Sequence, residues 1–175
     1  MSQLKVNSIV PTGGLPSGSN GGIIQVKQTI KKNVFTTSQG VGSGYTDLTG
    51  LSVAITPSSN SNKILVVTQI YNGAANNAVN FFRLLRGSTF IEQPSGTSSG
   101  TNYNAHAFSY YDANYQDSTA FSILDSPATT SETTYKIQGN NNGATCYLNR
   151  TNTDSDNSGY GRFISTFTLM EIAGW

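Results

Sequence analysis

The stretch RFISTFTLMEIAGW, residues 162–175, carries the clearest structural pattern in the chain. Alternate side chains of a β-strand lie on opposite faces, so this stretch presents two apolar sets. One set is Phe163, Phe167 and Leu169, and the other is Ile164, Met170 and Ile172. A strand with the core on one face and water on the other alternates apolar and polar residues. The pattern therefore predicts that the core covers one face and a second surface covers the other, with either set suited to the core.

Most of the remaining chain also has the alternation and composition of strands. The expected strand segments are 23–30, 45–57, 63–71, 79–91, 104–113, 118–126, 133–140 and 144–150. Segment 79–91 reads as a hairpin that turns near Arg86, Gly87 and Ser88. This makes nine or ten strands with no helical period between them, which predicts an all-β antiparallel sandwich. The number of strands is that of a jelly roll with one or two additional edge strands.

Residues 1–21 differ in composition from the rest. They contain a short apolar strip, Leu4, Val6, Ile9 and Val10, followed by a segment rich in Pro and Gly that disfavours regular structure. One interpretation is a loose chain end. We favour the other, an extended arm that docks on another protein through the apolar strip. The sequence thus predicts an attachment arm at 1–21 and a jelly-roll domain at 22–175.

Composition limits the classes of function. The chain has 175 residues with 11% charged residues and a net charge of +1, so no strong field attracts nucleic acid or an acidic membrane. Its 9 Tyr, 8 Phe and 1 Trp indicate a packed fold. Cys146 is the one cysteine, so no intramolecular disulfide is expected. We see no signal-peptide pattern and no membrane span, and expect synthesis in a cytoplasm.

The candidates for catalysis are weak. His106 is the one histidine, and without a G-x-S-x-G motif we expect a strand or surface residue rather than a member of a triad. A carboxylate pair could hydrolyse glycosidic bonds, but the acidic residues are scattered over loops and strand ends. Cys146 alternates with Ala144 and Leu148, which predicts a small buried side chain. No cofactor is expected.

The segment DSDNSGYGRFIS, residues 154–165, partly matches a calcium-binding loop. Asp154, Asp156 and Ser158 occupy the first, third and fifth positions, and Gly159 the sixth. The twelfth position, normally a bidentate Glu, is Ser165, and it lies in an expected strand. We interpret the segment as a polar turn, with a weak cation site at Asp154 and Asp156 left open.

A group of aromatic residues lies around 103–115. Tyrosine side chains stack on sugars and anchor interfaces with little loss of entropy. Some of the group must belong to the core, because AFSYY alternates. The candidates for contact with a glycan are Tyr103, Tyr110, Tyr111 and Tyr115.

Several stretches resemble small virion-associated proteins of tailed phages, above all those of cyanophages that are often labelled tail-fibre-like. These stretches are LKVNSI (4–9), GLSVAITPSSNSNKILV (50–66), LLRGST (84–89), LDSPATTSETTYKIQ (124–138) and LNRTNTDSDNSGYGR (148–162). The ending STFTLMEI also resembles the last strand of trimeric jelly rolls of the tumour-necrosis-factor and complement type. In those folds the last strand lies in the inner sheet, beside the threefold axis.

The resemblance implies a homotrimeric structural protein of the virion, with no enzymatic activity. One face of 163–172 would then contact neighbouring subunits, and KILVVTQIY (63–71), also apolar on both faces, would share that interface. The first candidate role is a short fibre or spike that docks on other virion proteins by its arm and binds host-surface glycan. The second is a head decoration protein on the capsid, and the third is a glycan depolymerase. No nucleic acid partner and no membrane insertion are expected.

Overall fold

The computed structural model describes residues 22–37, 44–74, 78–95, 104–111, 116–142 and 145–174. These residues form eleven strands: β1 (Ile23–Lys31), β2 (Phe35–Thr37), β3 (Thr46–Ile55), β4 (Lys63–Ala74), β5 (Ala78–Arg86), β6 (Thr89–Phe90), β7 (Ala107–Tyr111), β8 (Gln116–Asp125), β9 (Thr133–Asn141), β10 (Cys146–Leu148) and β11 (Ser165–Ile172). Among the described residues, no helix is long and apolar enough to cross a membrane.

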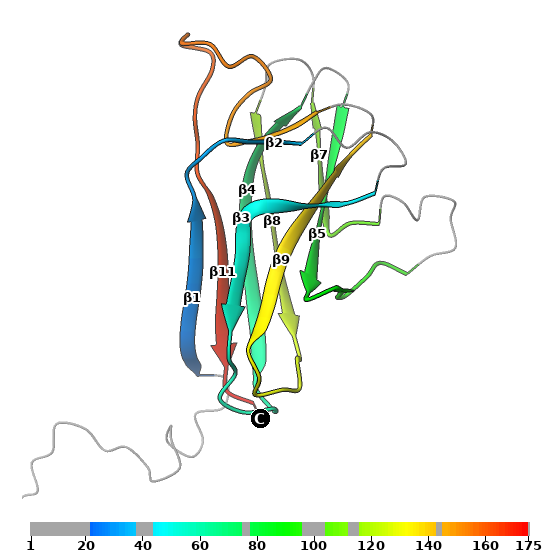
Figure 1. Ribbon diagram of the computed structural model, residues 1–175, viewed down its shortest axis with the longest axis vertical. Helices are drawn as coiled ribbons and strands as arrows, with labels where there is room; N and C mark the ends of the chain where they lie inside the picture. The colour runs from blue at the N-terminus through cyan, green and yellow to red at the C-terminus, as the bar shows by residue number, and fades with distance from the viewer. Residues whose placement is uncertain are drawn as a thin grey trace, which may run out of the picture.

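The strands form two antiparallel sheets that pack as a sandwich (Figure 1). In the first sheet the long strands follow the order β1-β11-β4-β8, and the short β10 and β2 continue the sheet beside one end of β4. In the second sheet the order is β3-β9-β5-β7, with β6 on the same edge of β5 as β7. In chain order the long strands alternate between the two sheets, except that β5 and β7 lie in the same sheet. This alternation is a jelly-roll-like arrangement. The predicted all-β antiparallel sandwich is confirmed.

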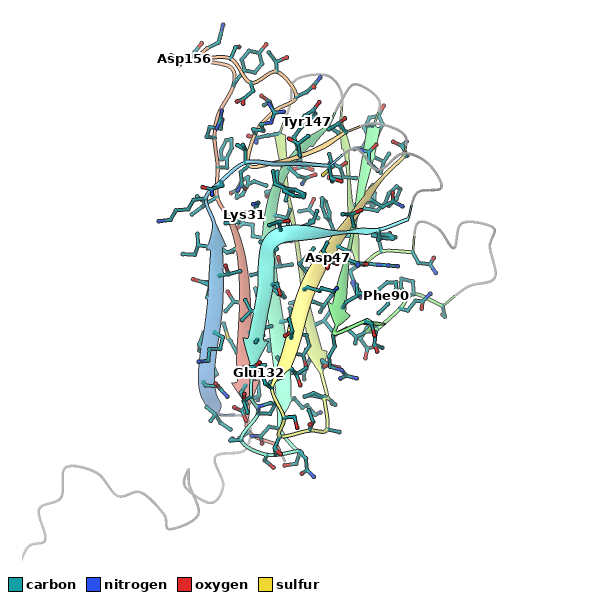
Figure 2. All side chains as sticks on the ribbon, viewed as in Figure 1. Lys31, Asp47, Phe90, Glu132, Tyr147 and Asp156 are labelled. Atoms are coloured by element: carbon teal, nitrogen blue, oxygen red, sulfur yellow. The ribbon has the colours of Figure 1, made fainter. Side chains whose placement is uncertain are left out.

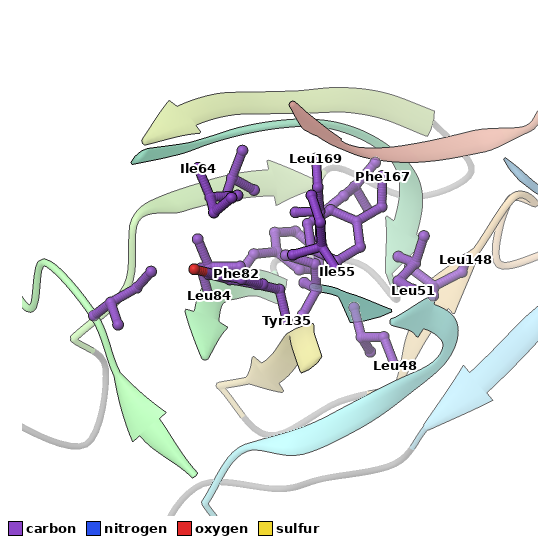
Figure 3. Close-up of a cluster of buried hydrophobic side chains, with 14 of the residues drawn as sticks. Leu48, Leu51, Ile55, Ile64, Phe82, Leu84, Tyr135, Leu148, Phe167 and Leu169 are labelled. Atoms are coloured by element: carbon purple, nitrogen blue, oxygen red, sulfur yellow. The ribbon is translucent and has the colours of Figure 1, made fainter. Parts of the chain in front are cut away.

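The core lies between the two sheets and consists of the inward side chains of both (Figure 3). The alternation expected in two segments is confirmed, since Leu51 and Ile55 of β3 and Ile64, Val66 and Ile70 of β4 are buried. The other large side chains of the core are Leu48, Phe82, Leu84, Tyr135, Ile137, Leu148, Phe167 and Leu169. Period-two patterning of apolar residues is thus what places these strands around one core.

Strand β11 lies between β1 and β4, inside its sheet. Phe167 and Leu169 point into the core, while Met170 and Ile172 lie on the outer face. The prediction that Phe163 shares the face of Phe167 and Leu169 is wrong. The strand begins only at Ser165, and Phe163 precedes it, 41% exposed, with its ring stacked on Tyr71 at 5.1 Å between centroids.

Two expected turns have different outcomes. The hairpin in 79–91 is confirmed: β5 and β6 pair Arg86 with Thr89 across a turn in which Gly87 has a φ of 59°. The sequence GNNNG, residues 139–143, has the Gly and Asn content of a turn, but β9 continues to Asn141, so the turn starts later. Gly139 lies in this strand, where a Cβ atom would come within 3.0 Å of the Leu48 side chain, so glycine permits close packing there.

The sandwich has two distinct ends (Figure 1). At one end Gly22 accepts a hydrogen bond from the N–H of Ala173 at 2.9 Å, so β1 begins where β11 ends. At the other end the connection from β10 to β11 projects as an irregular hairpin with Asp156 near its tip (Figure 2). A bridge between Arg150 and Arg162 joins the two sides of this hairpin.

Candidate functional site

The outer face of the first sheet carries a row of aliphatic side chains that crosses four strands. Its outward side chains come from β1, β11, β4 and β8, and we call this surface the aliphatic face. Val26, Met170, Leu65 and Leu124 form one row across all four strands, because each is the register partner of the next. Val26 is 54% and Leu124 43% exposed. A row of this kind across a sheet is unusual on a surface that faces only water.

Further exposed apolar side chains extend the aliphatic face along the strands: Ile23, Ile30, Val67, Phe163 and Ile164. Two of its polar residues already have partners on the same surface. Gln28 donates to the Thr168 hydroxyl at 2.8 Å, and Gln69 donates to the Tyr71 hydroxyl at 3.1 Å. Covering this surface would therefore leave these donors satisfied, which lowers the cost of burial.

The residues predicted at the trimer interface or core divide between these two places. Phe167 and Leu169 belong to the core, whereas Met170, Ile172, Phe163 and Ile164 lie on or beside the aliphatic face. Leu65 and Val67 of β4 join that face, as expected if the two doubly apolar segments share a surface. The predicted docking residues Leu4, Val6, Ile9 and Val10 lie outside the described residues.

The outer face of the second sheet has a different chemistry, and we call it the aromatic–polar face. Phe108 and Tyr110 of β7 project from it and are 67% and 58% exposed. Their register partners on β5 are Phe81 and Val79. Tyr110 is thus the one predicted glycan contact whose side chain is described. Tyr111 is described only as the last residue of β7, and Tyr103 and Tyr115 lie outside the described residues.

A chain of polar side chains crosses the same face from β5 over β9 to β3, where it ends at Asp47 (Figure 2). Arg83 of β5 donates through Nε and Nη2 to Gln138 of β9, at 2.9 and 2.7 Å. Gln138 donates to Asp47 of β3 at 2.7 Å, and Lys136 Nζ donates to the other Asp47 oxygen at 2.8 Å. The hydrogen bonds from Lys136 and then Gln138 lower the pKa of Asp47 below its usual value. The sequence interpretation missed this chain, although Lys136 and Gln138 alternate with buried residues in β9.

In the hairpin between β10 and β11, one of the two carboxylates considered for a weak cation site is paired with arginine side chains. Asp154 contacts Arg162 at 2.6 Å through Oδ1 and Arg150 at 3.2 Å through Oδ2, so both carboxylate oxygens face guanidinium groups. Within the described ranges, no three His, Cys, Asp or Glu side chains form a group that could hold a metal ion. Asp156 lines a shallow depression with Asp154, Tyr160 and Arg162.

His106 has a structural position. Its Nδ1 accepts a hydrogen bond from the N–H of Leu84, and its Nε2 lies 2.9 Å from the Ile91 carbonyl, to which it donates in this tautomer. The ring packs edge-on against Phe90 and stacks with Phe121. Burial lowers the pKa of His106, which favours the neutral ring. Both ring nitrogens have hydrogen-bond partners, and His106 directly precedes β7.

Other reactive groups are buried inside the fold. Cys146 is fully buried, and burial raises its pKa to about 12, so the prediction of a small buried side chain is confirmed. Asp125 accepts hydrogen bonds from Arg86 and Tyr135, and Glu171 accepts four from Gln25, Ser58 and Asn62. These carboxylates serve the packing of the sandwich.

Comparison with known proteins gives little further information. No protein-family model matches the chain, and no curated protein matches it. It is similar to a chain in a solved structure of the infectious bursal disease virus Gx strain, with 8% sequence identity and a TM-score of 0.42. The similarity covers 87% of this chain and 43% of that chain, so this chain spans less than half the length of that neighbour.

Proposed function

We propose that the protein is a non-enzymatic structural protein of a tailed-phage virion, a homotrimeric short fibre or spike. Its arm, residues 1–21, would dock on other virion proteins through Leu4, Val6, Ile9 and Val10. The sandwich would face outward and bind host-surface glycan. The resemblance of several sequence stretches to virion-associated phage proteins is the basis for the virion assignment.

The observation that carries the trimer is the aliphatic face. One in-register row of apolar side chains crosses four neighbouring strands, and further exposed apolar side chains lie along these strands. Among the described residues of these strands, Lys63 is the one charged residue whose side chain points outward. Monomeric proteins rarely expose such a patch. A second and third copy of the chain would cover it with an equally uncharged surface.

The arrangement of the two ends supports docking through the arm. The arm joins β1 at Gly22, at the end of the sandwich that also holds Ala173. The hairpin at Asp156 projects from the opposite end (Figure 2). In a trimer built on the aliphatic face, all three arms would leave from one end, and the opposite end would point away from the particle.

The experiment that tests the proposal is the mass of the full chain in solution, measured by light scattering. We expect three times the chain mass of 18.6 kDa. Val67→Asp, at the centre of the aliphatic face, should give a monomer, because each copy would bury an unpaired charge. The control is Val34→Asp, an exposed aliphatic residue outside this face, which should remain a trimer. A monomeric wild-type protein would overturn the proposal.

A further inference from the structure

We propose that Asn72 is a site of chemical modification, a deamidation site that the folded sandwich protects and that unfolding exposes. The modified chain would no longer refold, so unfolding becomes irreversible. This inference goes beyond the proposed function, because it concerns the lifetime of the folded chain rather than its assembly or its ligand.

The sequence identifies where the reaction is chemically easy. An asparagine followed by glycine deamidates readily, because glycine has no side chain to hinder the attack of its backbone nitrogen on the asparagine amide. The chain contains three such pairs, Asn20–Gly21, Asn72–Gly73 and Asn142–Gly143. Asn142 is exposed, whereas Asn72 is fully buried and lies in β4. At Asn72 the fold therefore decides whether the reaction takes place.

The Asn72 side chain is held by hydrogen bonds inside the sandwich. Its Oδ1 accepts the side-chain N–H of Asn80 at 2.9 Å and the hydroxyl of Ser109 at 2.7 Å. Its Nδ2 donates to the Thr119 hydroxyl at 3.4 Å, and all three partners are themselves buried. Rotation of the amide toward the Gly73 nitrogen would break these bonds in an interior where water does not replace them.

The backbone at this point is held as well. Gly73 pairs with Gln116 of β8 on one side and with Tyr147 of β10 on the other, and its carbonyl accepts an N–H of Asn80 at 3.2 Å. Ring closure onto Asn72 needs a rotation of the backbone away from the extended conformation of a strand. In the folded state this rotation requires β4 to leave both neighbouring strands, and such openings are among the most costly in a protein.

The reaction in the unfolded chain is a cyclisation followed by hydrolysis. The Gly73 nitrogen forms a bond to Cγ of Asn72, the Cγ–Nδ2 bond breaks, and the amide nitrogen leaves as ammonia with the proton of the Gly73 N–H. Solvent water then opens the five-membered succinimide. Opening at Cγ gives an aspartate, and opening at the backbone carbonyl carbon gives an isoaspartate, through which the chain continues by the former side chain.

Neither product suits the folded structure. An aspartate at position 72 would bury a carboxylate, and one of its oxygens would face the Ile70 carbonyl, to which Nδ2 now donates at 3.3 Å. An isoaspartate adds a backbone methylene at a position where β4 pairs with both β8 and β10, and so interrupts both ladders. The lifetime of the folded chain would then follow its rate of unfolding rather than its equilibrium stability.

The test compares full-length protein kept folded with full-length protein kept in urea, both at mildly alkaline pH. Peptide mass mapping over time measures modification at residues 72 and 142 in the same samples. In urea we expect similar rates at the two residues. In the folded protein we expect residue 72 to react at least about tenfold more slowly than in urea, because its reaction needs the opening of a central strand.

The second measurement follows refolding after dilution of the urea, with refolded chains separated from the rest by size-exclusion chromatography. Modification at residue 72 should be confined to chains that do not refold. Modification at residue 142 is the internal control and should divide evenly, because an aspartate there still accepts the N–H of Val79, now bonded to Asn142 Oδ1 at 2.8 Å.

Three outcomes would overturn the proposal. The first is equal modification of residue 72 in the folded and the unfolded samples, which would show that the fold does not protect it. The second is modified residue 72 at the same level in refolded and non-refolded chains. The third concerns Asn72→Asp, which we expect to yield no folded protein or a markedly lower thermal unfolding midpoint, so a wild-type midpoint would contradict the account.

Discussion

Glu171 shows how a single buried charge fixes one end of the sandwich. The side chain is fully buried on β11 and accepts hydrogen bonds from Asn62 and Gln25 at 2.5 Å each, and from the N–H and hydroxyl of Ser58 at 2.7 and 2.8 Å. Asn62 also accepts the N–H of Gly174 at 2.9 Å. Burial alone would raise the pKa of Glu171, but the hydrogen bonds together outweigh it and lower the pKa. One carboxylate thus joins β1, the loop before β4 and the end of β11.

We therefore expect Glu171→Gln to lower the free energy of unfolding by about 1–3 kcal/mol at pH 7, since the amide places an N–H group among donors. Urea denaturation measures this change. The folded pKa lies below the usual 4.5, so the stabilisation by the carboxylate is present above pH 4.5 and is lost as the pH falls through the folded pKa. The exposed Glu132→Gln should change stability by less than about 0.5 kcal/mol. Equal effects of the two substitutions would contradict this account.

The hydrogen bond to the His106 ring predicts that the free energy of unfolding depends on pH near neutrality. Its Nδ1 accepts the N–H of Leu84 only while the ring is neutral, and burial lowers its folded pKa below the usual 6.5. The unfolded chain therefore takes up this proton first, and the stability contributed by the neutral ring is present above pH 6.5 and lost as the pH falls through the folded pKa. Nearby Glu92 opposes this shift without reversing it.

The measurement is the thermal unfolding midpoint of wild type and of His106→Gln between pH 5 and pH 7.5. We expect the wild-type midpoint to fall toward pH 5, and the variant to show a flatter profile because it lacks the imidazole that titrates in this range. Parallel profiles of the two proteins would show that protonation of His106 does not control this part of the fold.

At the scale of elements, one ion pair links the two sheets. Asp125 of β8 contacts Arg86 of β5 at 2.7 Å and accepts the Tyr135 hydroxyl of β9 at 2.6 Å. Burial, and then the hydrogen bond to Asp125, raise the pKa of Tyr135, so this hydroxyl remains a donor. Asp125→Asn leaves the Arg86 charge without a carboxylate in a largely buried site, where loss of one partner costs several kcal/mol. We expect a loss of about 2–4 kcal/mol in chemical denaturation.

Asp47→Asn provides the comparison for Asp125→Asn, because Asp47 forms an ion pair within one sheet. The Asp47 side chain is 53% exposed and pairs with Lys136 within a single sheet, so its loss should cost less than about 1 kcal/mol. If the two substitutions destabilise the protein equally, the pairing between the sheets has no special role in stability.

The strands were predictable to the extent that their apolar residues alternate. Period two grouped Leu51 with Ile55, and Phe167 with Leu169, on one face of their strands, and both pairs lie in the core. For the last strand, period two did not decide which of the two apolar faces is the core. The alternation failed for Phe163, which lies before the start of β11. Its ring stacks on Tyr71, and no local sequence pattern indicates a tertiary contact of this kind. The same holds for Glu171, whose partners lie more than 100 residues away in the sequence. Only Tyr110 of the aromatic–polar face was singled out, since the chain from Arg83 to Asp47 forms across three strands.

At the scale of the whole molecule, the two outer faces divide the surface into parts with different chemistry. The aliphatic face presents an in-register row of apolar side chains, whereas the aromatic–polar face presents exposed rings on β7 and an ion pair between β3 and β9. Because these faces are on opposite sheets, a trimer assembled through the first would present the second outward. Assembly then uses the strands of one sheet alone, so changes in one face leave the other intact.

This division leads to a prediction about residues 1–21. Every residue of the described core and every residue of the aliphatic face lies at position 23 or later, so removal of residues 1–21 should leave a folded trimer. We expect the full chain and the shortened chain to have three times their respective chain masses by light scattering, and similar thermal unfolding midpoints. Two trimers would mean that the sandwich assembles by itself and leaves the arm available for docking. A folded but monomeric shortened chain would instead make the arm the trimerisation element, and the aliphatic face would then have to be covered by something other than neighbouring sandwiches.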